Sequence, residues 1–384
     1  MEGRPAEPHL SCVRWNDTPG ERSVAAMSDG ALLLADGSRF DGRGVGDDAL
    51  ALGEAVFYTG MTGYEEALTD PSYAGQLLTF TYPMIGNYGV SGEAAQHPHA
   101  CVAGAVMKRL AANPSHYALR SDLATWLRAE RVPALDGVDT RSLTITLREH
   151  GTIAGALAIG TAALDRADAA LAEYARLRTT VGLVAEVATQ SATTLPADGP
   201  HIVVLDCGVK NAILRNFAGL QARLTILPYD AAADEIRDLN PDGIVISPGP
   251  GDPTDVPATI DVLRSLLGEI PMFGVCLGHQ LLALACGAAT YKLPYGHRGG
   301  NQPVKVVRSG SVLVTAHNHG YAVDGASLPS ELEPTLINLN DGTNEGFRHR
   351  ELPIAAVQFH PEASPGPFDA RRLFAQWLAE LPSR

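Results

Sequence analysis

The chain has 384 residues, of which 45% are hydrophobic and 19% are charged. At about 100–200 residues per domain, this length predicts two domains that each bury a core, which excludes a single small scaffold. The 29 Lys plus Arg against 43 Asp plus Glu leave a formal net charge of −14. This acidic balance argues against nucleic acid or an anionic membrane as a partner, because binding phosphate requires clustered positive charge.

The five cysteines form no CxxC pair and are odd in number. They resemble neither a disulfide framework nor a zinc site, and they fit a reducing compartment. The N-terminal residues lack the apolar stretch of a signal peptide, and the long apolar run over 271–289 contains His279 and Gln280. The sequence therefore predicts a cytoplasmic protein without a membrane span.

Residues 1–26 are polar, contain Pro and Gly, and show no periodicity, which predicts a disordered leader. The alternative is that translation starts at Met27 and that the preceding 26 residues are a wrongly assigned start or a dispensable tail, and the sequence leaves it open. Residues 27–188 contain short mixed segments with strand-like runs, which predict an N-terminal mixed α/β domain. In this domain Ser121 and Asp139 are placed to cap two helices, and Gly151 is placed to end the second helix.

Thr, Ser, Pro and Gly dominate 189–200 without apolar periodicity, which predicts a linker. After it, short apolar strands alternate with helices over 201–384. This alternation predicts an α/β domain whose mostly parallel sheet is covered by helices. The predicted strands are 202–205, 224–227, 244–246 and 272–275, and the predicted helices are near 212–220, 231–239 and 258–267.

The sequence Gly-Val-Cys-Leu-Gly at 274–278 lies where a predicted strand runs into a helix. Small residues on both sides of Cys276 permit a sharp turn that holds its side chain out of the sheet, as in a nucleophile elbow. Free amides at the helix N-terminus also favour the thiolate. The alternative, a buried and inert cysteine, is disfavoured by this strand-turn-helix context.

A histidine and a carboxylate follow a late strand, at His360 and Glu362. Positions i and i+2 of an extended chain face the same side, so Glu362 can fix one imidazole nitrogen while the other faces Cys276. Taken alone, such a pair is more typical of a protein surface. Its combination with the cysteine elbow predicts a Cys-His-Glu triad.

The loop Ser-Pro-Gly-Pro-Gly-Asp-Pro at 247–253 directly follows a predicted strand. Its glycines let backbone amides approach a ligand closely, as an oxyanion hole requires. A tight strand-exit turn is the alternative reading. A phosphate cradle is disfavoured, because the G-x-x-x-x-G-K-[ST] spacing is absent.

Together, the cysteine elbow with its following Leu-Gly-His-Gln, the Pro-Gly-Pro-Gly loop and the His-Pro-Glu motif resemble class I triad glutamine amidotransferases. From about residue 28 to the end, the chain also resembles the small-subunit family of carbamoyl-phosphate synthetases. Other amidotransferases share the triad but lack this N-terminal companion domain. The segments that carry the second resemblance are 61–66, 69–73, 82–87, 139–141, 296–305 and 361–367.

The resemblance implies an enzyme subunit that hydrolyses glutamine and passes ammonia to a large synthetase subunit for carbamoyl phosphate synthesis. It implies that Cys276 is the nucleophile that forms a γ-glutamyl thioester, that His360 is the acid-base and that Glu362 orients it. The amides of Gly249 and Leu277 would form the oxyanion hole.

The resemblance also implies a glutamine-binding set and a partner. Because Ser72 comes from the N-terminal domain, the substrate would lie at the domain interface. No cofactor is expected in this chain, whereas ATP and Mg are expected on the large subunit. The carbamoyl phosphate made by the complex is expected to serve the pyrimidine and arginine pathways. The substrate glutamine would be held by Ser72, Gly249, Gly251, Leu277, Gln280, Asn318, Gly320 and Tyr321.

Two histidines, His317 and His319, flank Asn318 at a spacing found in metal sites. With no acidic or cysteine ligand set expected near them, structural or interface roles are predicted and no metal is expected. Two other functions are considered: a non-catalytic regulatory paralogue, and an amidotransferase or γ-glutamyl hydrolase of another system. The unaltered Cys, His and Glu disfavour the first, and the N-terminal half disfavours the second.

Overall fold

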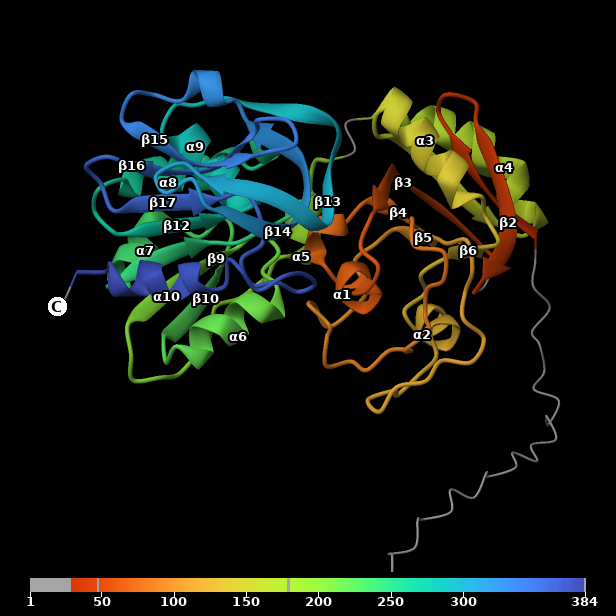
Figure 1. Ribbon diagram of the computed structural model, residues 1–384, viewed down its shortest axis with the longest axis horizontal. Helices are drawn as coiled ribbons and strands as arrows, with labels where there is room; N and C mark the ends of the chain where they lie inside the picture. The colour runs from red at the N-terminus through yellow and green to blue at the C-terminus, as the bar shows by residue number, and fades with distance from the viewer. Residues whose placement is uncertain (1–28, 47, 178–179, 383–384) are drawn as a thin grey trace, which may run out of the picture.

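A computed structural model describes residues 29–46, 48–177 and 180–382. The described chain forms two units that lie side by side, an N-terminal barrel and a C-terminal sheet covered by helices (Figure 1). The predicted leader over 1–26 lies outside the described residues. In the part of the chain that the structure describes, every helix falls short of the length or apolar character needed to cross a membrane.

The N-terminal barrel closes in the strand order β1-β2-β6-β5-β4-β3-β7. Its interior is filled by apolar side chains such as Leu32, Leu77 and Leu157, which are fully buried. The strands are β1 (Asp29–Leu34), β2 (Arg39–Val45), β3 (Ala49–Tyr58), β4 (Gln76–Phe80), β5 (Gly104–Val106), β6 (Ala134–Asp136) and β7 (Ile153–Ile159). The helices beside it are α1 (Tyr64–Leu68), η1 (Pro71–Tyr73), α2 (Leu123–Ala129), α3 (Thr140–His150), α4 (Thr161–Tyr174) and α5 (Leu183–Val187).

Aspartate side chains cap α2 and α3, the two helices whose caps the sequence predicted. Asp139 accepts a hydrogen bond from the Ser142 amide at 3.1 Å and caps α3, which ends at Gly151 as predicted. The prediction for α2 is wrong by one residue: Asp122, not Ser121, is the cap. Its carboxylate accepts hydrogen bonds from the amide and hydroxyl of Thr125 at 2.9 and 2.8 Å, which a serine hydroxyl one position earlier cannot reproduce.

The C-terminal unit is a ten-stranded sheet in the order β14-β13-β15-β16-β17-β12-β11-β9-β10-β8. Its strands are β8 (Thr193–Leu195), β9 (His201–Asp206), β10 (Arg223–Pro228), β11 (Gly243–Ile246), β12 (Met272–Val275), β13 (Thr290–Val306), β14 (Val312–Val323), β15 (Leu332–Asn338), β16 (Asn344–His349) and β17 (Ile354–Val357). Its helices are α6 (Asn211–Gly219), α7 (Ala233–Asp238), η2 (Pro253–Asp255), α8 (Pro257–Leu266), α9 (Leu277–Ala285), η3 (Gly325–Ser327) and α10 (Arg372–Ala379).

The centre of this sheet is parallel over β10, β9, β11, β12 and β17. One face packs on α8 and α9 through residues such as Leu263 and Leu281. The other face packs on α6 and α10 through residues such as Phe217 and Phe374. This arrangement confirms the predicted α/β fold with a helix-covered parallel core. The sequence allowed the prediction because strands that are buried on both faces are apolar throughout.

Beyond β17 the sheet continues through the antiparallel strands β16, β15, β13 and β14, of which β13 and β14 reach toward the barrel (Figure 1). The sequence did not predict this antiparallel arm. The Thr59 hydroxyl of the barrel donates to the carbonyl oxygen of Arg298 on β13 at 2.9 Å. The Thr152 amide donates to the Pro294 carbonyl oxygen at 2.8 Å. The arm therefore connects the two units.

The segment 189–200 is not an irregular linker throughout. Thr193–Leu195 form β8, which pairs antiparallel with β10 at the edge of the sheet. Three exposed residues suffice here, because an edge strand needs hydrogen-bonding partners on one side only, and Thr is well accommodated in strands. The sheet thus begins inside the segment predicted to be a linker.

Candidate active site

Cys276 occupies the turn between β12 and α9 with φ of 55° and ψ of −103°, a conformation that costs a non-glycine residue strain. Glycines beside it make the turn possible. A Cβ atom on Gly274 would lie 2.5 Å from the Gly278 carbonyl oxygen, and one on Gly278 would lie 2.2 Å from the Ile246 carbonyl oxygen. The structure therefore places Cys276 in the predicted elbow, with its thiol 3.6 Å from the Asn318 carbonyl oxygen.

His360 and Glu362 form a buried pair just after β17. The His360 Nδ1 lies 2.8 Å from Glu362 Oε1. The other ring nitrogen, Nε2, has no hydrogen-bond partner among the described residues. Burial favours the neutral ring, but the Glu362 carboxylate and the Cys276 thiolate outweigh burial and raise the pKa of His360 to about 10. The geometry therefore favours an imidazolium beside the cysteine.

A buried lysine, which the sequence analysis missed, completes this pair. Lys210 Nζ lies 2.9 Å from Glu362 Oε1, 3.4 Å from Asp70 Oδ2 and 2.6 Å from the Ser364 carbonyl oxygen. Burial alone would raise the pKa of Glu362, but Lys210 and His360 lower it to about 2. Glu362 therefore stays ionised, as an orienting carboxylate must.

The loop after β11 approaches the cysteine closely. A Cβ atom on Gly249 would lie 2.3 Å from the Cys207 carbonyl oxygen and 2.7 Å from Leu277 Cδ2, so only glycine fits there. Gly251 has a φ of +88°, which also favours glycine. Gly249 and Leu277, the two predicted oxyanion-hole residues, line the same pocket as Cys276.

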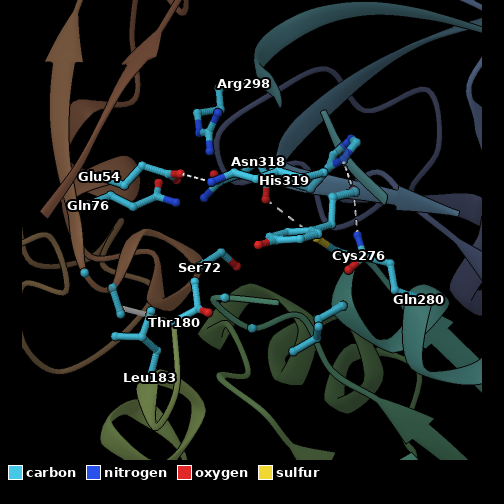
Figure 2. Close-up of a pocket in the computed structure, with 18 residues that line it drawn as sticks. Glu54, Ser72, Gln76, Thr180, Leu183, Cys276, Gln280, Arg298, Asn318 and His319 are labelled. Carbon is cyan, nitrogen blue, oxygen red and sulfur yellow. Dashed lines mark hydrogen bonds and ion pairs between the residues drawn. The ribbon is translucent and has the colours of Figure 1, made fainter. Parts of the chain in front are cut away.

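One pocket between the barrel and the sheet brings together Cys276 and all of the residues predicted to bind glutamine (Figure 2). The Ser72 hydroxyl and the Asn318 amide oxygen are buried and have no hydrogen-bond partner within the described ranges. Buried polar groups are normally paired, so both are available to a ligand. The predicted members of the lining are Ser72, Gly249, Gly251, Leu277, Gln280, Asn318, Gly320 and Tyr321.

The backbone of Tyr321 is part of a hydrogen-bonded wall of this pocket. The Gln280 side-chain amide donates to the Tyr321 carbonyl oxygen at 2.7 Å and to Gln358 Oε1 at 3.0 Å. Tyr321 therefore joins this wall through its backbone carbonyl oxygen.

The pocket also contains charged side chains that the sequence analysis did not select. Arg298 donates from Nη1 to the Tyr295 carbonyl oxygen at 2.7 Å, whereas its Nε and Nη2 are buried without a hydrogen-bond partner in the described part of the chain. Glu54 on β3 forms an ion pair with Lys292 on β13. Other unpredicted lining residues include Gln76, Thr180 and Leu183. Of these residues, only Arg298 lies within a segment that carried the family resemblance.

The environment of His317 and His319 differs from the prediction. Sequence proximity provided no further ligand, but the fold brings His297 and Glu345 to both histidines, with all four side chains buried. The premise that no acidic ligand lies near them is therefore wrong. His279, in contrast, is buried against Gln358 and Asn344 and belongs to the core.

The site and fold define an α/β protein with a cysteine nucleophile elbow. Comparison with known proteins agrees: residues 203–379 match the family model "Glutamine amidotransferase class-I". Residues 32–157 match the model "Carbamoyl-phosphate synthase small chain, CPSase domain".

Individual relatives extend this similarity over both units. The carbamoyl phosphate synthase small chain of Symbiobacterium thermophilum is 47% identical over 351 residues, covering 90% of this chain and 97% of that protein. Those of Listeria monocytogenes serotype 4b and Archaeoglobus fulgidus are 45% and 46% identical, covering 92% and 91% of this chain and 96% and 98% of the relatives. The chain belongs to the carbamoyl phosphate synthase small chain family.

Proposed function

We propose that this chain is the glutaminase subunit of a glutamine-dependent carbamoyl-phosphate synthetase and hydrolyses L-glutamine through a Cys276-His360-Glu362 triad. One observation carries the proposal. The cysteine elbow, whose thiol borders the buried His-Glu pair, and all of the predicted glutamine-binding residues line one pocket at the domain interface.

In the first half-reaction, the Cys276 thiolate attacks the side-chain carbonyl carbon of glutamine. The amides of Gly249 and Leu277 donate hydrogen bonds to the oxyanion that develops. His360 gives the proton on Nε2 to the departing nitrogen, so that ammonia leaves and a γ-glutamyl thioester remains. Glu362 holds Nδ1 throughout and keeps the ring in its productive orientation.

In the second half-reaction, the neutral His360 accepts a proton from water while that water attacks the thioester carbonyl. The C–S bond breaks, glutamate leaves and the thiolate-imidazolium pair of Cys276 and His360 is restored. Burial of the site limits access of bulk water to the thioester.

The ammonia is the product that the partner uses. Because the chain belongs to the small-chain family, we place ATP, Mg and the synthesis of carbamoyl phosphate on a large synthetase subunit. The product would enter pyrimidine and arginine synthesis. A cytoplasmic location, proposed from the cysteine content, fits such a role.

The test compares the wild type with Cys276→Ser, each with and without the large subunit, while glutamate and carbamoyl phosphate are followed. Only the wild type should hydrolyse glutamine, and the Cys276→Ser complex should still make carbamoyl phosphate from added ammonia. Cys286→Ser, at the other end of α9, is the matched control and should retain glutamine hydrolysis. Hydrolysis by Cys276→Ser at the wild-type rate would show that the triad assignment is wrong.

A further inference from the structure

Three histidines and one glutamate converge behind the glutamine pocket. His297 lies on β13, His317 and His319 lie on β14, and Glu345 lies on β16. All four side chains are buried, and one ligand atom from each lies within 4.8 Å of the others. The pairing of His297 with His319 in the β13–β14 register brings residues far apart in sequence to this point.

Hydrogen bonds on the outer side of each ring fix its tautomer. The Nδ1 of His319 lies 2.8 Å from the Tyr321 carbonyl oxygen, which only accepts, so this nitrogen carries the proton. The Nε2 of His297 lies 2.8 Å from the carboxylate of Asp341 and carries a proton for the same reason. In the neutral rings, the inward nitrogens His319 Nε2 and His297 Nδ1 are therefore unprotonated, and each presents a lone pair.

The tautomer of His317 follows from its neighbour. The Thr315 hydroxyl donates its single proton to the Gln302 carbonyl oxygen at 3.0 Å. It must then accept from His317 Nε2, which lies 2.8 Å away. The Nδ1 of His317 is consequently unprotonated as well, and it lies 3.1 Å from His319 Nε2.

The inward atoms are thus all acceptors. Glu345 Oε2 and His297 Nδ1 have no hydrogen-bond partner in the described ranges. Glu345 Oε1 is held by the Asn338 amide at 2.9 Å, which orients the carboxylate toward the rings. Three lone pairs and a carboxylate that face one another in a buried site repel unless a cation lies between them.

We propose that His297, His317, His319 and Glu345 bind one divalent transition-metal ion, with Zn²⁺ as the best fit. Three imidazoles and a carboxylate are ligands that Zn²⁺ takes, and bonds of about 2.0–2.1 Å in a tetrahedron separate the ligand atoms by about 3.3 Å. Here His317 Nδ1 lies 3.1 Å from His319 Nε2 and 3.7 Å from Glu345 Oε2, and His297 Nδ1 lies 3.7 Å from the other carboxylate oxygen, Glu345 Oε1. The outer hydrogen bonds to Asp341, Thr315 and Tyr321 are the kind that orient metal-binding histidines.

Four protein ligands fill a tetrahedral ion, so this site is structural and not catalytic. The ion would cross-link β13, β14 and β16. Asn318, between two of the ligands, accepts a hydrogen bond from the Cys276 thiol and donates one to Asp70. The metal would therefore stabilise the strand that forms one wall of the pocket, whether or not the pocket binds glutamine.

The test measures metal in the full-length chain. Wild-type protein, incubated with ZnCl₂ and dialysed against metal-free buffer, should retain about one Zn²⁺ per chain by mass spectrometry of the elements. Co²⁺ in its place should give the intense visible absorption of a tetrahedral site. His317→Gln and Glu345→Gln should each weaken Zn²⁺ affinity at least tenfold and reduce the tetrahedral Co²⁺ spectrum.

The matched control removes a histidine pair with the same spacing elsewhere. His97 and His99 are two residues apart on a loop outside the cluster, and the double change to Gln should leave stoichiometry and spectrum unchanged. Circular dichroism establishes that each variant is folded. The proposal is overturned if the wild type retains no Zn²⁺ and gives no tetrahedral Co²⁺ spectrum. In that case a proton on one of the inward atoms, and not a metal ion, relieves their repulsion. Retention of Zn²⁺ by both folded ligand variants at wild-type affinity overturns it equally, and these outcomes do not depend on glutaminase activity.

Discussion

His360 gains a carboxylate partner on folding, and this links the stability of the protein to pH. The pKa of His360 is about 10 in the folded chain, against about 6.5 for an unperturbed histidine. A raised folded-state pKa contributes stability that is complete below pH 6.5 and is lost as the pH rises toward 10. The ionised Glu362, with a pKa of about 2, remains charged across this window.

We therefore compare the thermal unfolding midpoints of the wild type and His360→Gln. The difference between them, wild type minus variant, should fall by at least about 4 °C when the pH is raised from 6.5 to 10. Differential scanning calorimetry over this range measures the difference. The exposed His116 provides a control, since His116→Gln should follow the wild-type curve in parallel. A constant difference between wild type and His360→Gln would contradict the raised pKa.

Arg298 carries a buried positive charge with unused donors directed at the pocket. Buried guanidinium N–H groups without a hydrogen-bond acceptor are costly, and the α-carboxylate of glutamine would accept from them. Charged hydrogen bonds of this kind contribute about 1.5–3 kcal/mol, so Arg298→Gln should raise the KM for glutamine about 10- to 100-fold. The kcat should change much less, because this contact does not touch the reacting atoms.

Steady-state kinetics of glutamine hydrolysis separates these two effects. Arg264→Gln, which removes a guanidinium on the exposed surface of α8, should leave both constants unchanged. An Arg298→Gln enzyme with the wild-type KM would show that another group binds the α-carboxylate.

At the scale of the elements, the elbow depends on the close approach of α9 to β11 and β12. Alanine at Gly278 would place a Cβ atom 2.2 Å from the Ile246 carbonyl oxygen, a backbone atom that cannot move aside. We expect Gly278→Ala to destabilise the chain by about 1–3 kcal/mol. Urea unfolding followed by fluorescence measures this effect.

Gly219 offers the matched control, because it ends α6 and a Cβ atom there would meet no atom within 4 Å. Gly219→Ala should therefore be neutral or stabilise by about 0.5–1 kcal/mol, through its greater helix propensity. Equal unfolding midpoints for the two variants would show that the elbow tolerates a side chain at position 278.

Local signals in the sequence account for the parts of the site that were predicted. The elbow, the Pro-Gly loop and the His-Pro-Glu motif are each continuous segments whose turn residues and strand ends are readable on their own. Lys210 and Glu345 carry no such signal, and the segment 69–73 that contains Asp70 does not show its contact with Lys210. Long-range pairing brings them in: Asp70 reaches Lys210 across the domain interface, and β16 brings Glu345 to β14.

The same reasoning explains what was missed in the fold. The alternation of apolar strands and amphipathic helices predicted the parallel core, because its residues are buried on both faces. Within the arm from β13 to β16, β13 has polar and glycine-rich sequence that lacks a clear period, and its placement depends on long-range pairing with β14 and β15. The three-residue β8 depends on pairing with β10, which no local pattern shows.

At the scale of the whole molecule, the pocket is assembled from both units. Ser72 comes from the barrel and Cys276 from the sheet, and polar contacts join the two units. Among these contacts, the backbone N–H of Asn211 donates to the backbone carbonyl oxygen of Gln96 at 2.9 Å, and Lys210 Nζ lies 3.4 Å from Asp70 Oδ2. Interfaces of this polar kind permit small relative motions of domains.

A partner that binds across both units can therefore change the rate of the reaction. A misplacement of about 1 Å can cost 10²-fold in rate, so we expect glutamine hydrolysis by the chain alone to be slow and to rise about 10- to 100-fold when the large subunit is added. Asp70→Asn, which weakens the link to Lys210 and Asn318, should lower the stimulated rate at least tenfold, whereas Asp261→Asn on the exposed surface of α8 should not. Equal turnover with and without the large subunit would contradict this coupling, and would mean that the two units already hold Ser72 and Cys276 in the productive geometry.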